Sequence, residues 1–346
     1  MEPHVTGAER LSLRPVFLPR KRRLETATHP ARVSLKGLLS ATLLVCGVGL
    51  WFVTLLGFAG AAWWLLDLFS HFRVQYLVLA TVAALLLLWM RNRRAAAAMA
   101  VCAAVNLAVV LPYLAPTALF RASTSRSGVV RVATANVHTA NRDHGAVARF
   151  LSGSRADFVV LLEVDDAWLS GLSGLRREFP YGVHEARDDN FGIALLSRHP
   201  CVQCRIVRLG EAGVPSVMGE FEVRGSRFTL VGTHPLPPVG AEYARLNAEQ
   251  VRSVAAYMAD LRGPKVLVGD LNMTPWSAHF QPLLRRAGLR DSGAGRGVGW
   301  TWPTHAPLLG IPIDHVLTSP GVHVVERKRG PDVGSDHLPV LVSFVP

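Results

Sequence analysis

The hydrophobic and polar positions divide the chain into two unlike parts. The first part holds three long apolar runs, Leu35–Phe58, Val74–Met90 and Ala95–Ala115, in which Lys36 is the only charged residue. Their lengths of about 24, 17 and 21 residues are close to the roughly 20 that a helix needs to cross a bilayer. We therefore predict a three-helix transmembrane anchor over residues 35–116. Three helices buried in a soluble core are the alternative interpretation.

From Val129 onward, short apolar segments alternate with longer amphipathic ones, which predicts alternating strands and helices. The expected strands are Val129–Asn136, Asp157–Glu163, Phe191–Ser197, Cys201–Leu209, Val217–Val223, Arg227–His234, Lys265–Asp270, Ile313–Thr318, His323–Arg327 and Leu338–Phe344. The expected helices are His144–Leu151, Ala167–Phe179, Ala241–Leu261 and Ser277–Ala287. This mixture predicts an α+β sandwich, with two packed sheets and helices outside them.

Most of the basic surplus lies beside the apolar runs. The formal net charge is +12, from 37 Lys and Arg against 25 Asp and Glu. Residues up to Pro116 hold about 12 basic and 4 acidic side chains, whereas the remainder holds about 25 and 21. A nucleic-acid-binding domain usually needs a concentrated Lys and Arg footprint. The charge distribution therefore favours contact with a membrane, and makes nucleic acid a less favoured partner.

The basic clusters also predict the orientation of the anchor. Arg20–Arg23 precede the first run, and Arg91–Arg94 lie between the second and third. Because basic residues stay on the cytoplasmic side, residues 1–34 are predicted to be a disordered cytoplasmic tail and residues 117–346 an extracytoplasmic domain. About 13 residues separate Ala115 from Val129, and they span at most about 45 Å. The outer domain is therefore expected to lie close to the membrane.

The four cysteines do not form a metal motif. Cys46 and Cys102 lie within apolar runs, whereas Cys201 and Cys204 form a single C-x-x-C in a predicted strand. Residues three apart on a regular strand point to opposite faces, and one C-x-x-C without a second ligand pair is weak for zinc. We interpret all four as structural, with the oxidation state of the last two left open.

Several predicted strands begin or end in residues that suit a catalytic site. The positions are Asn136, Glu163, His234, the pair Asp270 and Asn272, Asp314, and the pair Asp336 and His337. One such strand end is ordinary turn chemistry. Six of them, all drawn from Asn, Asp, Glu and His, predict a shared polar pocket at one edge of the sandwich.

The chemistry of this set fits the hydrolysis of phosphate esters. Carboxylate and amide oxygens suit Mg²⁺, Mn²⁺ or Ca²⁺ rather than zinc, and histidines titrate near neutral pH. A metal would neutralise the phosphate, a base would activate water, and a donor would stabilise the charge that develops.

The motifs resemble those of the endonuclease/exonuclease/phosphatase superfamily, the fold of pancreatic deoxyribonuclease, sphingomyelinases and inositol polyphosphate phosphatases. TANVH, LLEVD, NFGIALLSR, VGTHP, VGDLN, TWP, IDHVL and SDHLPV occur in this order, and the resemblance covers Val129 to the C-terminus. It implies a four-layer α/β/β/α sandwich and a hydrolase that depends on Mg²⁺ or Mn²⁺.

The resemblance also implies a role for each residue. Glu163 would be the main metal ligand, with Asn136 and Asp336 close to the metal. Asp270 would orient or deprotonate the attacking water, and Asn272 would hold a phosphate oxygen. His234 and His337, the latter oriented by Asp314, would contact the phosphate and move protons. The family often adds a tyrosine, for which Tyr181 is a candidate, and we interpret His138, His305 and His315 as structural.

The three spans ahead of this domain resemble the membrane-anchored members associated with resistance to glycopeptide antibiotics of the teicoplanin and vancomycin type. The leading hypothesis is a membrane-tethered phosphoesterase that acts on a lipid-linked phosphate, with a prenyl pyrophosphate of cell-wall synthesis as the first choice. A surface-tethered nuclease and a non-catalytic binding protein are the alternatives. Several apolar residues near the motifs are expected at the membrane interface, namely Trp276, Trp300, Trp302, Leu308 and Leu309. For Trp302, a position in the core is an alternative of at least equal weight.

Overall fold

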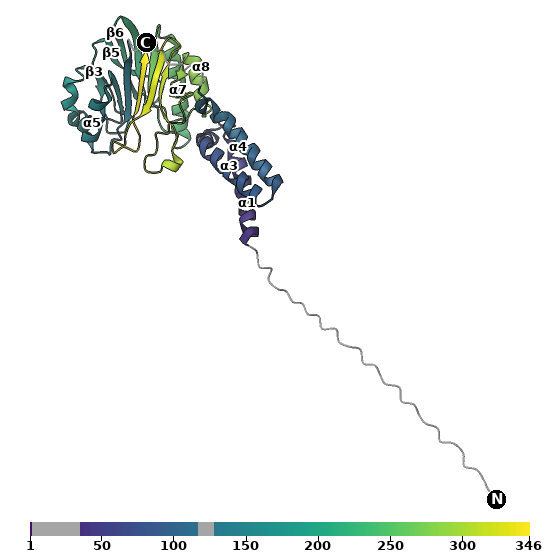
Figure 1. Cartoon of the computed structure of the whole chain (residues 1–346). Helices are drawn as coiled ribbons and strands as arrows, with labels where there is room; N and C mark the ends of the chain where they lie inside the picture. The colour runs from purple at the N-terminus through teal and green to yellow at the C-terminus, as the bar shows by residue number, and fades with distance from the viewer. Residues whose placement is uncertain (2–34, 117–127) are drawn as a thin grey trace.

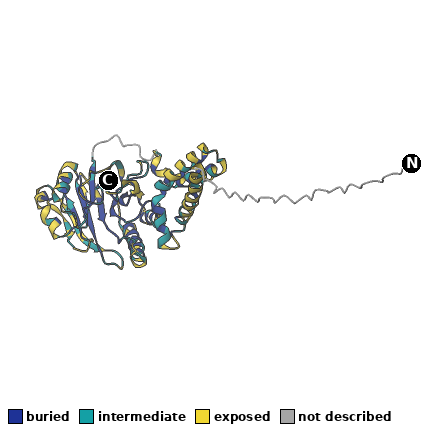
Figure 2. Cartoon of the chain, turned by 90° about the horizontal axis from the view of Figure 1, so that it is seen from below, coloured by how far each residue is buried: buried dark blue, intermediate teal, exposed yellow. Residues whose placement is uncertain are grey.

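The structure, a computed structural model, describes Met1, residues 35–116 and residues 128–346. The predicted tail and the domain boundary near residue 117 lie outside these residues. Within them, three helical stretches are long and apolar enough to cross a membrane: Leu35–Leu56, Trp64–Trp89 and Arg93–Leu114. They form a bundle below the globular domain (Figure 1), and much of their outer surface is exposed (Figure 2).

The second stretch begins at Trp64 rather than at Val74. It consists of helix α2 (Trp64–Leu68), the 3₁₀ turn η1 (Phe69–Phe72) and helix α3 (Arg73–Trp89). The first stretch is helix α1 (Leu35–Leu56), and the third is helix α4 (Arg93–Leu114). The polar side chains of Asp67, His71 and Arg73 are buried within the protein. A hydropathy pattern reads such residues as a loop, because it does not show that other parts of the chain cover them.

The globular domain has the predicted four layers, with two six-stranded sheets face to face and helices on both outer faces. The first sheet has the order β11-β12-β1-β2-β4-β3 and the second β5-β6-β7-β8-β10-β9. The strands are β1 (Val130–Asn136), β2 (Phe158–Leu162), β3 (Tyr181–Glu185), β4 (Ile193–Ser197), β5 (Cys201–Arg208), β6 (Pro215–Val223), β7 (Ser226–Gly232), β8 (Lys265–Asp270), β9 (Arg290–Asp291), β10 (Asp314–Thr318), β11 (His323–Arg329) and β12 (Val340–Val345).

The alternation of apolar residues along each strand builds the layers. In β2, Phe158 and Val160 face the core between the sheets, whereas Val159 and Leu161 face helices on the outside. Those helices are α5 (His144–Ser154), α6 (Asp166–Gly171) and the 3₁₀ turn η3 (Ser173–Arg177). Helices α7 (Ala241–Asp260) and α8 (Phe280–Ala287) cover the second sheet in the same way. The buried strands form the dark centre of the domain in Figure 2.

The anchor contacts the globular domain directly. The hydroxyl of Tyr113, at the end of α4, donates to the carboxylate of Asp291 at 3.1 Å. The carbonyl oxygens of Pro112 and Tyr113 accept from the backbone N–H groups of Gly295 and Gly297 at 2.9 and 2.8 Å. The globular domain and the three-helix bundle therefore share a docked interface, whereas the distance of the domain from a membrane stays a prediction.

The predicted geometry of the C-x-x-C pair is wrong. Cys201 and Cys204 form a disulfide, and both pack against the core between the sheets. The pairing of β5 with β6 shifts register between Cys201 and Gln203. This bulge breaks the regular alternation, and it brings the two side chains to the same face.

Candidate active site

The sheet topology places the predicted site residues at one edge of the sandwich. Strands β1 and β2 pair in parallel, so Asn136 at the end of β1 lies beside Glu163, which directly follows β2. Strands β8 and β10 pair antiparallel, with Asp270 directly opposite Asp314. Strand β7 runs parallel to β8, and His234 follows it. His337, just before β12, lies beside Asp270. Six chain segments therefore meet where the strand ends of both sheets converge.

The backbone conformation around Gly269 positions the polar side chains of Asp270 and Asn272. Gly269 has φ of +151°, and a Cβ atom there would lie 1.9 Å from the carbonyl oxygen of Thr233. Asn272 has φ of +52°, a left-handed conformation that Asn tolerates better than most residues. Its backbone N–H donates to Asp270 Oδ1 at 2.8 Å, and its side-chain Nδ2 donates to the carbonyl of Pro235 at 2.9 Å. The turn thus fixes the directions of both functional side chains.

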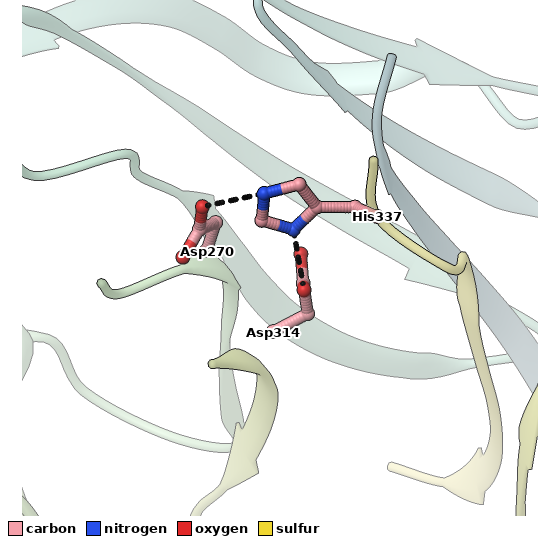
Figure 3. Close-up of side chains that lie close together, drawn as sticks. All are labelled: Asp270, Asp314 and His337. Atoms are coloured by element: carbon pink, nitrogen blue, oxygen red, sulfur yellow. Dashed lines mark hydrogen bonds and ion pairs between the residues drawn. The ribbon is translucent and has the colours of Figure 1, made fainter. Parts of the chain in front are cut away.

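The core of the site is a buried row of alternating carboxylates and imidazoles. His337 Nδ1 donates to Asp314 Oδ2 at 2.9 Å, and its Nε2 lies 3.6 Å from Asp270 Oδ2. Figure 3 shows the ring of His337 between the two carboxylates. His234 Nε2 lies 3.5 Å from the same Asp270 oxygen. Asp270 therefore faces two histidines, and one of these is held by a second carboxylate.

The electrostatics of this row favour charged groups despite burial. Burial is the largest influence on His337 and opposes its protonation, but Asp314 and Asp270 outweigh it and raise the pKa to about 10. The pKa of His234 is also raised, because Asp270 and Glu163 outweigh its burial. Burial alone would raise the pKa of Asp270, yet the two histidines lower it. Asp270 is thus an ionised acceptor beside the protonated His337, and the same carboxylate favours the protonated form of His234.

The metal-ligand candidates lie beside this row. Asn136 Nδ2 donates to Glu163 Oε1 at 2.7 Å and to Asp270 Oδ2 at 3.4 Å. Asp336 Oδ2 accepts from the indole N–H of Trp302 at 3.0 Å, and its other oxygen lies 3.5 Å from His138 Nδ1. The carboxylates of Glu163 and Asp336 both line the same pocket. The ligand atoms that these side chains offer to a cation are all oxygens, and the carboxylates keep lone pairs that can face the pocket. Such a set of ligands fits a hard divalent cation.

A second group of close ligand atoms suits a metal less well. The side chains of Asp270, Asp314 and His337 offer ligand atoms within 4.8 Å of one another. However, both nitrogens of His337 already face the two carboxylates, so the three groups satisfy each other. The side chains of Glu163 and Asp336, which line the pocket, are therefore the better candidates for a cation.

The site opens into a pocket of about 570 Å³. Of the predicted residues, the pocket wall includes Glu163, His234, Asp270, Asn272, Asp336 and His337. The sequence interpretation did not assign residues of four other segments to the site: Leu68, His71 and Phe72 of the anchor; Asp189, Asn190 and Phe191 before β4; Pro237, Pro238, Val239 and Tyr243 around the start of α7; and Trp302, Ile311 and Ile313 before β10. The available sequence signals were the motif NFGIALLSR, which contains Asn190 and Phe191, and the motif TWP, which contains Trp302.

Other predicted residues lie elsewhere. Tyr181 pairs with Ser197 in the sheet, at the end of β4 opposite to the end nearest Glu163, so it does not reach the pocket. His305 is exposed, and His315 is buried with its Nε2 donating to the carbonyl of Met273 at 2.9 Å. Of the apolar residues expected at the membrane interface, Leu308 and Leu309 are exposed, but Trp276 packs against Tyr113 of the anchor.

Comparisons with known proteins agree with this architecture. Residues 133–337 match the model of the Endonuclease/Exonuclease/phosphatase family. An endonuclease/exonuclease/phosphatase from Beutenbergia cavernae has a similar structure, with 23% identity and a TM-score of 0.53, over 63% of this chain and 71% of that one. The mannosyl-6-phosphatase of Bacteroides thetaiotaomicron has 21% identity and a TM-score of 0.51, over 63% and 100%.

A third similar structure is D. rerio TDP2 complexed with single strand DNA product, with 16% identity and a TM-score of 0.54, over 63% of this chain and 99% of that one. No curated protein sequence gives a significant match. At these identities the solved structures establish the shared fold, whereas the family match rests on the sequence itself.

Proposed function

The chain belongs to the endonuclease/exonuclease/phosphatase family, and we propose that it is a membrane-anchored phosphoesterase that hydrolyses a lipid-linked phosphate outside the cytoplasm. The observation that carries this proposal is the docking of the site onto the anchor. The carboxylate of Asp67, between the first two spans, accepts from Ser277 Oγ and Ala278 N at 2.7 and 2.8 Å. Those partners lie a few residues after Asp270 and Asn272, so the site is fixed beside the membrane segment.

The family is divalent-metal dependent, and we propose Mg²⁺ or Mn²⁺ as the cation. Asn136, Glu163 and Asp336 would hold it, and when bound it would neutralise charge on the phosphate. Glu163 carries the φ of +61° that turns its side chain out of the strand. Asn136 orients that carboxylate by a hydrogen bond of 2.7 Å. The ligands are therefore positioned before a cation or substrate binds.

The buried row can perform the proton transfers of hydrolysis. Asp270, ionised and 1% exposed, accepts a proton from the attacking water while the oxygen of that water forms a bond to phosphorus. The phosphorus–oxygen bond to the leaving group then breaks, and His337 donates a proton to the leaving oxygen. Asn272 and His234 donate to the other phosphate oxygens, which carry the developing charge. With a prenyl pyrophosphate, the products are a prenyl phosphate and inorganic phosphate.

We further propose that the domain lies outside the cytoplasm. The basic residues at Arg91–Arg94 favour a cytoplasmic position for the loop between the second and third helices. The disulfide between Cys201 and Cys204 supports the same arrangement, because disulfides persist in oxidising compartments. If the substrate is a cell-wall prenyl pyrophosphate, expression of the chain is expected to change susceptibility to glycopeptide antibiotics.

A phosphate-release panel tests the proposal. The full-length protein in liposomes, with Mg²⁺, is compared on prenyl pyrophosphates, phospholipids, sugar phosphates and plasmid DNA. Release of phosphate from a lipid, abolished in Glu163→Gln, is expected. Efficient cutting of DNA without release from any lipid refutes the lipid proposal and makes the protein a tethered nuclease.

A further inference from the structure

The segment between the first two membrane helices forms part of the active-site pocket. We refer to residues 64–72, which comprise α2 and η1, as the α2–η1 segment. Its residues Leu68, His71 and Phe72 line the pocket that also contains Asp270 and His337. One wall of the pocket is therefore catalytic and another belongs to the anchor.

Hydrogen bonds hold this wall in place. Asp67 is buried and accepts from Ser277 and Ala278, as described above. His71 Nδ1 hydrogen-bonds with Thr274 Oγ1 at 3.0 Å, and both residues are buried. The partners Thr274, Ser277 and Ala278 follow the catalytic turn in sequence. The distance between the anchor wall and the catalytic turn is thus fixed by buried polar contacts at two points.

The rim of the pocket near the anchor is apolar. Val239, which lines the pocket, and Leu308, in the loop just before the pocket residue Ile311, are 70% and 90% exposed, although both carry large aliphatic side chains. Gln75, in the first turn of α3, donates to the carbonyl oxygen of Gly310 at 2.9 Å. This contact places the loop of Leu308 next to the start of a membrane-spanning helix. An aliphatic rim at that level is suited to contact with lipid chains.

The wall leads directly into a membrane span. Phe72 is the last residue of η1, and α3 begins at Arg73. A hydrocarbon chain that leaves the catalytic end along Leu68 and Phe72 therefore reaches the bilayer surface within one short segment. A soluble sugar phosphate or a DNA strand would leave these aliphatic and aromatic surfaces without an apolar partner.

We propose that Leu68 and Phe72, the two apolar residues of the α2–η1 segment that line the pocket, determine specificity by holding the first part of the hydrocarbon chain of a lipid phosphate. This inference rests on the proposed function, since it requires that the phosphate be lipid-linked. It adds that the membrane anchor selects the substrate, in addition to holding the enzyme at the membrane.

The test compares two substrates with the same head group. Full-length protein is assayed on a long-chain prenyl pyrophosphate in liposomes and on a short, water-soluble prenyl pyrophosphate. In the double variant Leu68→Ala/Phe72→Ala, kcat/KM for the long-chain substrate is expected to fall about 10- to 100-fold, as loss of apolar pocket contacts does. For the short substrate it is expected to change less than about 2-fold.

A matched control comes from the same segment. Leu65→Ala/Phe69→Ala removes the same residue types from positions that do not line the pocket, and it is expected to leave both substrates unchanged. An equal loss on both substrates by the Leu68/Phe72 variant, or no loss on either, overturns the inference and leaves the proposed function intact. Failure of the unmodified protein to release phosphate from any lipid instead refutes the proposed function.

A binding measurement complements the turnover assay. A lipid phosphate with a photoactivatable group in its chain, added to unmodified protein in EDTA, is expected to label the peptide that contains Leu68 and Phe72. Labelling confined to other membrane helices overturns the inference. This readout requires neither turnover nor a correctly folded variant.

Discussion

The pair of Asp314 and His337 offers the sharpest test of the buried row. In Asp314→Asn, an amide of nearly the same shape replaces the carboxylate that accepts from His337 Nδ1 at 2.9 Å. The amide can still accept a hydrogen bond, but it cannot compensate the charge of an imidazolium. Both side chains are at most 6% exposed, so water cannot take over that role.

The expected loss of stability and of rate in Asp314→Asn follows from the loss of a buried hydrogen bond between two charged groups. Such a bond contributes about 1.5–3 kcal/mol, so the free energy of unfolding is expected to fall by about 2–3 kcal/mol. Because His337 loses both its orientation and its charge partner, the rate is expected to fall by about 10²- to 10⁴-fold. Unchanged turnover would show that Asp314 does not orient a catalytic histidine.

The pH dependence of stability gives a second and independent readout. The pKa of His337 is about 10 in the folded protein against an ordinary value of 6.5. Protonated His337 therefore stabilises the fold fully below pH 6.5, and this contribution is lost as the pH rises through about 10. In Asp314→Asn the folded pKa is lower, so the decline of stability between these pH values is expected to become smaller.

The assay is urea unfolding of the metal-free protein in EDTA at several pH values, together with phosphate release in Mg²⁺ at one pH. Asp291→Asn is the matched control. Asp291 is also a buried carboxylate, but it accepts from Tyr113 rather than from His337. Asp291 also lies 3.9 Å from His315, whose pKa burial lowers from 6.5. This control is therefore expected to lose stability but to keep its rate and its pH slope between 6.5 and about 10. An unaltered slope in Asp314→Asn would refute the assignment of the raised pKa to this pair.

Three further predictions concern the metal, the topology and the anchor. Glu163→Gln, which keeps the size of the side chain, and EDTA treatment are each expected to reduce the rate by about 10² or more, and added Mg²⁺ or Mn²⁺ should restore activity only in the second case. A phosphatase reporter fused after Pro346 is expected to be active and one fused after Arg94 silent; the reverse pattern would place the domain in the cytoplasm. Asp67→Ala leaves the buried Ser277 Oγ and the partly buried Ala278 N without their acceptor, so unfolding by urea should show a loss of about 2–4 kcal/mol, whereas equal stability would mean that the anchor is not docked there.

The fold and most of the polar site could be predicted because each motif coincides with the end of a strand. A buried strand such as β8 must pass from apolar to polar residues where it leaves the core, and Asp270 lies at that point. The order of motifs then indicates which strand ends come together. The side-chain contacts follow from pairing, as for Asp270 opposite Asp314.

Other features depend on contacts between segments that local patterns do not report. The bulge at Val202 reverses the expected direction of Cys204 relative to Cys201, since one extra residue changes the face of every following side chain. The strand β3 was not predicted, because its residues are largely exposed and show no apolar alternation. The polar residues of the α2–η1 segment resemble an ordinary loop until their partners at residues 274–278 are known.

The docked anchor limits the positions and orientations that the globular domain can adopt relative to the helical bundle. A flexible tether of about 13 residues would let the domain move across tens of ångströms and reach both soluble and membrane substrates. Here two separate parts of the anchor, Asp67 near the start of the second stretch and Tyr113 at the end of α4, are bound to the domain. Two attachment points prevent rotation about either one, so the pocket keeps one orientation relative to the membrane helices. Under the proposed function, this fixed orientation would favour substrates that lie in the membrane, before any chemistry at Asp270 begins.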